Sequence, residues 1–133
     1  MNSVQALREY PGQCHCGAVR FRVTLPPAVT VYRCNCSVCT KTGFRHLIVA
    51  GDQLKILSGE DQLRDYRFNT RTARHLFCRH CGIKPFYVPR SHPDGYSVNF
   101  HCLALDSHVD ADIRDFDGRH WSRNIDSIKN PDP

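Results

Sequence analysis

Seven of the eight cysteines in this chain of 133 residues fall into three tight groups. These groups are "CHC" at 14–16, "CNCSVC" at 34–39 and "CRHC" at 78–81. A disulfide framework would pair cysteines of varied spacing, whereas C-x-C and C-x-x-C groups bring neighbouring sulfur atoms to one metal ion. The pattern therefore predicts a small fold that is held together by metal ligation.

The first and last groups together offer four sulfur ligands. Cys14 and Cys16 lie two residues apart, so their side chains point to the same side of an extended chain. Cys78 and Cys81 form a C-x-x-C knuckle, and Gly82 after it can adopt the conformation that ends such a turn. Two pairs of this kind make a closed four-cysteine zinc site.

The middle group, Cys34, Cys36 and Cys39, offers three ligands. Three protein ligands leave a fourth position on a zinc ion for water or a substrate thiol, which is the layout of a catalytic zinc site. The spacing leaves this division open, because the three could share an ion with a cysteine of another pair, or Cys102 could complete the set. Cys102 is better explained as a buried residue on the apolar face of a strand.

Alternating apolar and polar residues predict a mainly β fold of short strands. The alternation is clearest where Val19, Phe21, Val23 and Leu25 would share one buried face. Strands are expected at 18–25, 29–34, 45–50, 53–59, 63–70, 73–78, 84–90 and 95–105, and short helices only at 37–43 and 122–130. We expect residues 1–133 to form a single domain.

The chain carries a modest positive charge, +5 with its histidines neutral. This excess suits an anionic ligand, but it is too small and too scattered for a nucleic-acid surface. No apolar run approaches the roughly 20 residues that span a bilayer. The N-terminus lacks the basic start and apolar core of a signal peptide. We therefore expect a cytoplasmic protein without nucleic-acid or membrane partners, and the sequence does not indicate its oligomeric state.

Five segments of the chain stand out, which are "GQCHCGAVRF", "CNCSVCTKTG", "FCRHCGIKPFY", "VNFHCL" and "FDGRHW". In these segments, in order and over nearly the whole chain, the sequence resembles the glutathione-dependent formaldehyde-activating enzyme family. Within that family the chain looks closest to the centromere protein V branch. The segments that carry this closer likeness are "RHLIV", "YRFNT", "FCRHCG", "FYVPRSHPDGY" and "HCL".

The resemblance implies a β-tent (Mss4-like) fold, in which zinc staples small β-sheets together with little helix. It implies two zinc ions per chain, of which the second could be labile. The implied ligands are Cys14, Cys16, Cys78 and Cys81 for a structural zinc, and Cys34, Cys36 and Cys39 for a second zinc with its fourth place open.

The activity that the resemblance implies is the joining of glutathione to formaldehyde to give S-hydroxymethylglutathione. This reaction is classed with the carbon–sulfur lyases, because its reverse breaks a C–S bond. A metal lowers the pKa of a thiol, so zinc at the open position could hold the glutathione sulfur as thiolate. Three thiolate ligands reduce the Lewis acidity of the ion, and we therefore favour sulfur binding over polarisation of the carbonyl. Cys34, Cys36 and Cys39 then act in catalysis as ligands of the open zinc site.

Other polar residues near the cysteine groups are candidates for contact with the substrate. Arginine and lysine suit the carboxylates of glutathione, and histidines suit a polar pocket. The candidates are Lys41, Arg45, Arg74 and Arg90 for the carboxylates, and His46, His75 and His92 for the pocket. The resemblance gives no ligand role to His15, His80 or His101.

Two alternatives belong to other functional classes. One is a non-catalytic zinc module that binds a protein partner. It would be favoured if Cys102 or a histidine closed the site at Cys34, Cys36 and Cys39. The other is a nucleic-acid-binding zinc ribbon, which is weak because basic residues are not clustered and no platform of aromatic and basic residues is evident.

Overall fold

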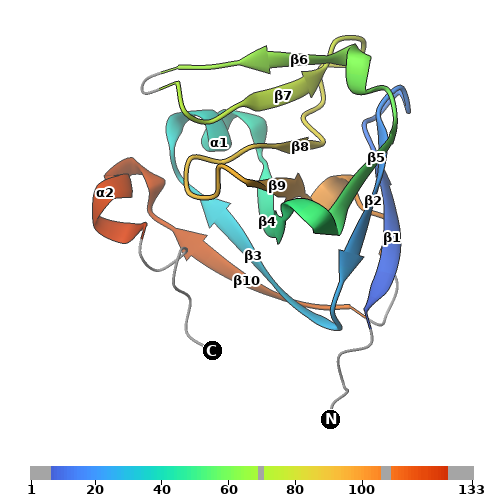
Figure 1. The fold of residues 1–133 in the computed structure, drawn as a ribbon. Coiled ribbons are helices and arrows are strands. Elements are labelled where there is room, and N and C mark those ends of the chain that lie inside the picture. The colour runs from blue at the N-terminus through green and yellow to red at the C-terminus, as the bar shows by residue number, and fades with distance from the viewer. Residues whose placement is uncertain (1–6, 69–70, 106–108, 126–133) are drawn as a thin grey trace.

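The computed structural model describes residues 7–68, 71–105 and 109–125. Short strands are its main regular element (Figure 1). The strands are β1 Arg8–Gln13, β2 Arg20–Leu25, β3 Ala28–Cys34, β4 Arg45–Ala50, β5 Leu54–Ser58, β6 Leu63–Tyr66, β7 His75–Cys78, β8 Phe86–Tyr87, β9 Gly95–Asn99 and β10 Asp110–Phe116. The helices are α1 Ser37–Thr42 and α2 Trp121–Asn124, and short 3₁₀ turns occupy 51–53, 60–62, 100–102 and 118–120.

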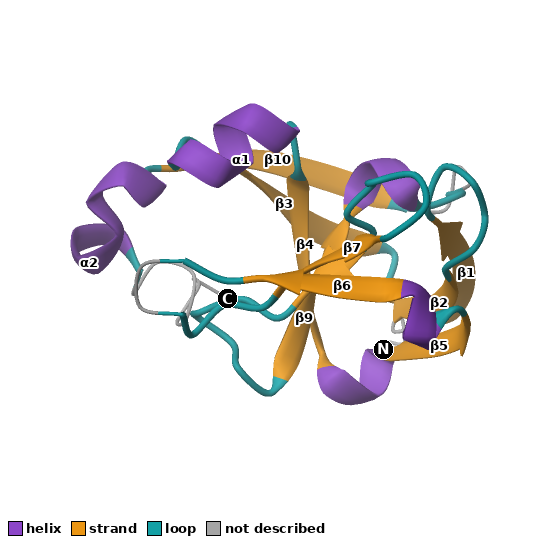
Figure 2. Ribbon diagram, turned by 90° about the horizontal axis from the view of Figure 1, so that it is seen from above, coloured by secondary structure: helices purple, strands orange, loops and turns teal. Residues whose placement is uncertain are grey.

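The strands form three small sheets, as Figures 1 and 2 show from two directions. The orders are β1-β2-β5, β10-β3-β4-β9-β8 and β6-β7. All neighbouring strands are antiparallel except β10, which runs parallel to β3 along one edge of the five-stranded sheet. An isolated bridge between Arg74 and Val88 connects the two-stranded sheet to the segment after β8. Among the described residues, no helix has the length and apolar character that crossing a membrane requires.

The core lies between these sheets. Apolar residues alternate inward along β2 and the residue before it as predicted, and Val19, Phe21, Val23 and Leu25 are almost completely buried. The Phe21 ring meets the ring of Phe86 on β8 edge to face, with 5.2 Å between ring centroids. This contact joins the three-stranded sheet to the five-stranded one through the centre of the molecule.

The predicted fold class, mainly β with small sheets and little helix, is confirmed. All eight expected strand regions contain a strand, and α1 lies where the first helix was expected. The second helix, α2, begins at Trp121. The described part of the chain leaves out residues 126–130 of this expected helix and residues 69–70 of one expected strand. Two strands, β1 and β10, were not predicted. Both are edge strands, where a proline or a run of exposed charged residues is tolerated. Pro11 therefore interrupts the alternating pattern of β1, and β10 is acidic and mostly exposed.

One predicted strand was too long. The strand expected at 95–105 ends at Asn99, where the side chain of Asn99 accepts a hydrogen bond from the backbone N–H of His101. This bond caps a 3₁₀ turn over 100–102. Cys102 therefore lies in a turn and not on the apolar face of a strand. It is half-buried and packs against the core.

The Phe21 contact gives a test of the core. We predict that Phe21→Ala lowers the free energy of unfolding by about 3–5 kcal/mol, because it leaves a cavity between two sheets. Leu57→Ala is the control, since Leu57 is 45% exposed, and it should change that free energy by no more than about 0.5 kcal/mol. Urea denaturation of metal-saturated protein measures both. Equal effects of the two substitutions would contradict this account of the core.

Candidate metal centres and the cavity beside them

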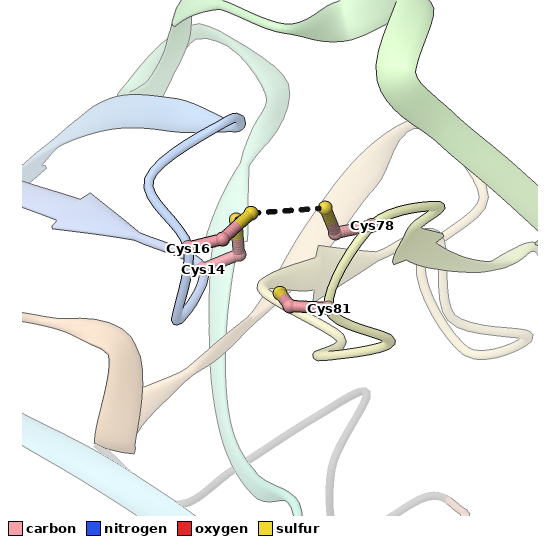
Figure 3. Close-up of side chains that lie close together, drawn as sticks. All are labelled: Cys14, Cys16, Cys78 and Cys81. Atoms are coloured by element: carbon pink, nitrogen blue, oxygen red, sulfur yellow. Dashed lines mark hydrogen bonds between the residues drawn. The ribbon is translucent and has the colours of Figure 1, made fainter.

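The first candidate metal centre brings together four cysteines from two distant turns. The sulfur atoms of Cys14, Cys16, Cys78 and Cys81 all lie within 4.8 Å of one another. Figure 3 shows them converging from the turn after β1 and the turn after β7. The sulfur of Cys16 lies 3.8 Å from that of Cys14 and 3.7 Å from that of Cys78. Four sulfur atoms in this arrangement could hold one metal ion.

Each of these turns is shaped by a glycine in the left-handed region. Gly17 has φ +80° and Gly82 has φ +76°. The N–H of Gly17 donates to the carbonyl of Cys14, and the N–H of Gly82 donates to the carbonyl of Cys78. The N–H of Val19 also points at the Cys14 sulfur, 3.4 Å away. Such N–H···S bonds favour the thiolate form that metal binding needs.

The second candidate centre is the three-cysteine group. The sulfur atoms of Cys34, at the end of β3, and of Cys36 and Cys39, around the first turn of α1, lie within 4.8 Å of one another. Cys39 is buried and the other two are half-buried. Hydrogen bonds from Cys34 and Cys39 lower the pKa of the Cys36 thiol to about 2. Within the described residues, no histidine, carboxylate or fourth cysteine joins this group.

His46 on β4 contacts the three-cysteine group through the sulfur of Cys39. Its Nε2 lies 3.1 Å from the Cys39 sulfur, and its Nδ1 lies 3.0 Å from the Ser97 hydroxyl and 3.1 Å from the Tyr87 hydroxyl. Burial, together with the charge of Lys84, lowers the pKa of His46 to about 3, so the imidazole is neutral. A thiolate at Cys39 can only accept, so we assign the ring proton to Nε2, which donates to the Cys39 sulfur, while the lone pair of Nδ1 accepts from one of the two hydroxyls.

The segment after β10 packs against the same group. A Cβ on Gly118 would overlap the sulfur of Cys34. Asn35, between two of the cysteines, holds this segment in place: its side-chain amide donates to Asp117 (2.9 Å), and its side-chain oxygen accepts from the N–H of Arg119 (3.0 Å). The close approach of this segment therefore depends on glycine at position 118.

A cavity of about 820 Å³ opens beside the three-cysteine group. It falls within the usual size range of small-molecule sites. All three cysteines reach its wall, together with Phe68, Tyr87 and Trp121. Three arginines, at positions 90, 119 and 123, also line it, and the guanidinium of Arg90 lies 3.7 Å from the centroid of the Trp121 ring. The positive charge of this wall suits an anionic ligand.

The structure separates the predicted contact residues into two sets. His46, His75 and Arg90 line the cavity. The other four candidates, Lys41, Arg45, Arg74 and His92, do not. Arg74 forms an ion pair with Asp65 (3.2 Å), and His92 lines a second, smaller cavity.

The sequence reasoning missed Lys84, which is only 7% exposed. Its Nζ lies 2.6 Å from His75 Nδ1 and 3.9 Å from the centroid of the Tyr87 ring. Burial lowers its pKa to about 8, while the nearby thiolates, Cys39 first among them, act in the opposite direction. A signal was present in the sequence, because Lys84 is the one charge within the run "GIKPFYV".

Comparison with known proteins adds three findings. The profile of the family described as glutathione-dependent formaldehyde-activating enzyme matches residues 9–119. A Halomonas elongata protein, provisionally named as a glutathione-dependent formaldehyde-activating enzyme, is 36% identical over 78 residues, which cover 53% of this chain and 50% of that protein. The chain thus matches about half the length of this curated relative. The crystal structure of a Rhodobacter sphaeroides protein is 33% identical with a TM-score of 0.67, covering 80% of this chain and 99% of that one.

The two groups of cysteines should respond differently to substitution. We predict that Cys78→Ser lowers the free energy of unfolding by more than about 4 kcal/mol, because a closed metal site contributes directly to folding. Cys36→Ser should leave a folded protein that has lost one bound metal ion. Metal analysis after zinc loading and urea denaturation measure these effects.

Cys102→Ser is the matched control, since Cys102 lies outside both groups, and it should keep the full metal content. If Cys36→Ser unfolds as readily as Cys78→Ser, both centres are structural and the distinction between them is wrong.

Proposed function

This chain belongs to the glutathione-dependent formaldehyde-activating enzyme family, and from that premise we propose that it is a zinc-dependent enzyme of the carbon–sulfur lyase type. Its substrate is an adduct of glutathione or a similar thiol, as in the formation of S-hydroxymethylglutathione from glutathione and formaldehyde. The observation that carries this proposal is the three-cysteine group in the wall of a cavity lined by arginines.

The donor atoms of both centres fit zinc. Sets of three or four thiolates are characteristic zinc ligands. We assign the structural zinc to Cys14, Cys16, Cys78 and Cys81, and the second zinc to Cys34, Cys36 and Cys39. A zinc ion bound at the second centre would lower the pKa of a substrate thiol that reaches its open position.

Residues behind the second centre keep its geometry and charge in place. His46 holds the Cys39 sulfur through its Nε2–H, so this ligand keeps one orientation. Three thiolates and one divalent cation carry a net charge of −1, which is costly to bury alone. The ammonium group of Lys84 supplies the opposite charge within the protein.

The arginines of the cavity would hold the carboxylates of glutathione. A guanidinium group binds a carboxylate through two parallel hydrogen bonds. Arg119 already uses its Nε to bind the backbone carbonyl of Asn35. Arg90 and Arg123 line the cavity and form no ion pair in the part of the chain that the structure describes. We therefore assign carboxylate binding to these two.

The alternative, a zinc module that only binds a protein partner, would be favoured by a fourth ligand at the second centre. The described residues supply none. The likeness to the centromere protein V branch, a single domain over residues 1–133 and a cytoplasmic location stay predictions.

Binding of glutathione tests this proposal. Calorimetric titration of zinc-loaded protein should show binding, and an assay with formaldehyde should show S-hydroxymethylglutathione formation above the spontaneous rate. We predict that Arg90→Gln and Arg123→Gln each weaken glutathione binding by about 10-fold or more, because each removes a charged hydrogen-bond donor.

Arg45→Gln is the matched control, since Arg45 does not line the cavity, and its affinity for glutathione should equal that of the wild type. If the wild type shows neither binding nor turnover, the named activity is wrong for this chain.

A further inference from the structure

Lys84 is a buried cation that contacts two residues of the cavity wall, His75 and Tyr87, although it does not line the cavity itself. Its ammonium group lies over the rings of Tyr87 and Phe44, 3.9 Å and 4.9 Å from their centroids. The only hydrogen-bond acceptor recorded for it among the described side chains is His75 Nδ1, at 2.6 Å. An ammonium group can donate but cannot accept, so Nδ1 must be the acceptor of this bond.

The bond from Lys84 fixes the proton of His75. Because Nδ1 carries the lone pair, the ring proton of the neutral imidazole lies on Nε2. Burial, and then the charge of Lys84, lowers the pKa of His75 to about 4, which keeps the ring neutral. The ring is also held between Tyr87 and Phe68, with centroid distances of 4.9 Å and 5.3 Å and nearly parallel planes.

The second nitrogen of His75 has no protein partner in the described part of the chain, although the residue is only 6% exposed. Buried polar groups are normally paired. His75 lines the same cavity as the three cysteines, so a ligand in that cavity is the natural partner of Nε2–H. His46 differs in this respect, since both of its nitrogens are already bonded.

We propose that His75 is a catalytic residue that donates Nε2–H to the oxygen of the aldehyde as the carbon–sulfur bond forms, and that Lys84 is the positioning residue that holds it in the donating tautomer. This inference rests on the proposed function and assigns the proton donor of that reaction.

The substrates, His75 and Lys84 together supply every proton and electron pair that moves in this step. The thiolate sulfur of the substrate forms the bond to the carbonyl carbon, and the π electrons of the carbonyl move to its oxygen. That oxygen takes the proton from His75 Nε2, while Lys84 passes one ammonium proton to Nδ1 and becomes an amine. The proton that the thiol released when it ionised returns through the cavity to His75 Nε2, and Nδ1 hands its proton back to Lys84, so that both groups regain their starting forms. In the lyase direction the same transfers run in reverse.

The alternative is that Lys84 and His75 only fill space in the core. The two roles predict different results for His75→Gln and Lys84→Met, which keep much of each side chain's volume. With glutathione and formaldehyde as substrates, His75→Gln should lower kcat by about 100-fold or more. Zinc content and affinity for glutathione should stay those of the wild type. A role in packing alone would change stability but not selectively reduce kcat.

Nitrogen NMR of ¹⁵N-histidine-labelled, zinc-loaded protein provides a readout that does not depend on turnover. The wild type should show the proton of His75 on Nε2, and Lys84→Met should shift the ring toward a mixture of the two tautomers. His101→Gln and Lys41→Met are the controls, because neither residue lines the cavity, and both should behave as the wild type in every measurement.

The outcomes separate the two proposals. If the wild type turns over and folded His75→Gln turns over equally well, His75 is not catalytic while the proposed function stands. A wild type with no turnover overturns the proposed function and this role together. A proton on Nδ1 of His75 in the NMR spectrum overturns the tautomer assignment whatever the kinetics, and it decides the matter if His75→Gln does not fold.

Discussion

The convergence of four sulfur atoms from the turns after β1 and β7 is the constraint on which the rest of the structure depends. Cys16 and Cys78 are 62 residues apart in sequence, yet their sulfur atoms lie 3.7 Å apart. Small sheets such as these bury little apolar surface individually, so a metal ion that linked them through these cysteines would carry much of the stability. The turn that contains Cys78 leads directly to Lys84 and then to β8. The position of the four-cysteine group therefore also bears on one wall of the cavity, to which Tyr87 of β8 belongs.

Charged and neutral groups are arranged around the second centre. The sulfur atoms and the neutral imidazoles of His46 and His75 all line the cavity, His46 bonds to the sulfur of Cys39, and the buried Lys84 bonds to His75. A histidine next to a thiolate would ordinarily be expected to gain a proton. Burial and the Lys84 ammonium prevent this, because each lowers the pKa of both histidines. Burial and, after it, this lysine keep both imidazoles neutral, so that each ring can donate a proton without first becoming a cation.

The sequence allowed prediction of the features that depend on local pattern. The cysteine spacing indicated the groups, and the alternation in β2 indicated its buried face, because both depend on residues close along the chain. The positions of Lys84, Gly118 and β10 depend on tertiary contacts. Lys84 is buried because it bonds to His75 and lies over aromatic rings from other parts of the fold. Gly118 is required because β10 pairs with β3 and brings the next segment against Cys34. No periodicity along the chain carries such information.

The same distinction separates the two cysteine groups and supports the proposal that one serves structure and the other chemistry. In the four-cysteine group the N–H···S bond to Cys14 and the turns at Gly17 and Gly82 come from within a few residues of the ligands, so the group is shaped by its own loops. The three-cysteine group takes its support from β4, β8, β9 and the segment after β10, through side chains that meet only in the folded protein. These surrounding elements, and not a fourth ligand, hold the three sulfur atoms in place. One side of the group can therefore stay uncovered. That uncovered side faces the cavity, where the arginines and His75 also lie.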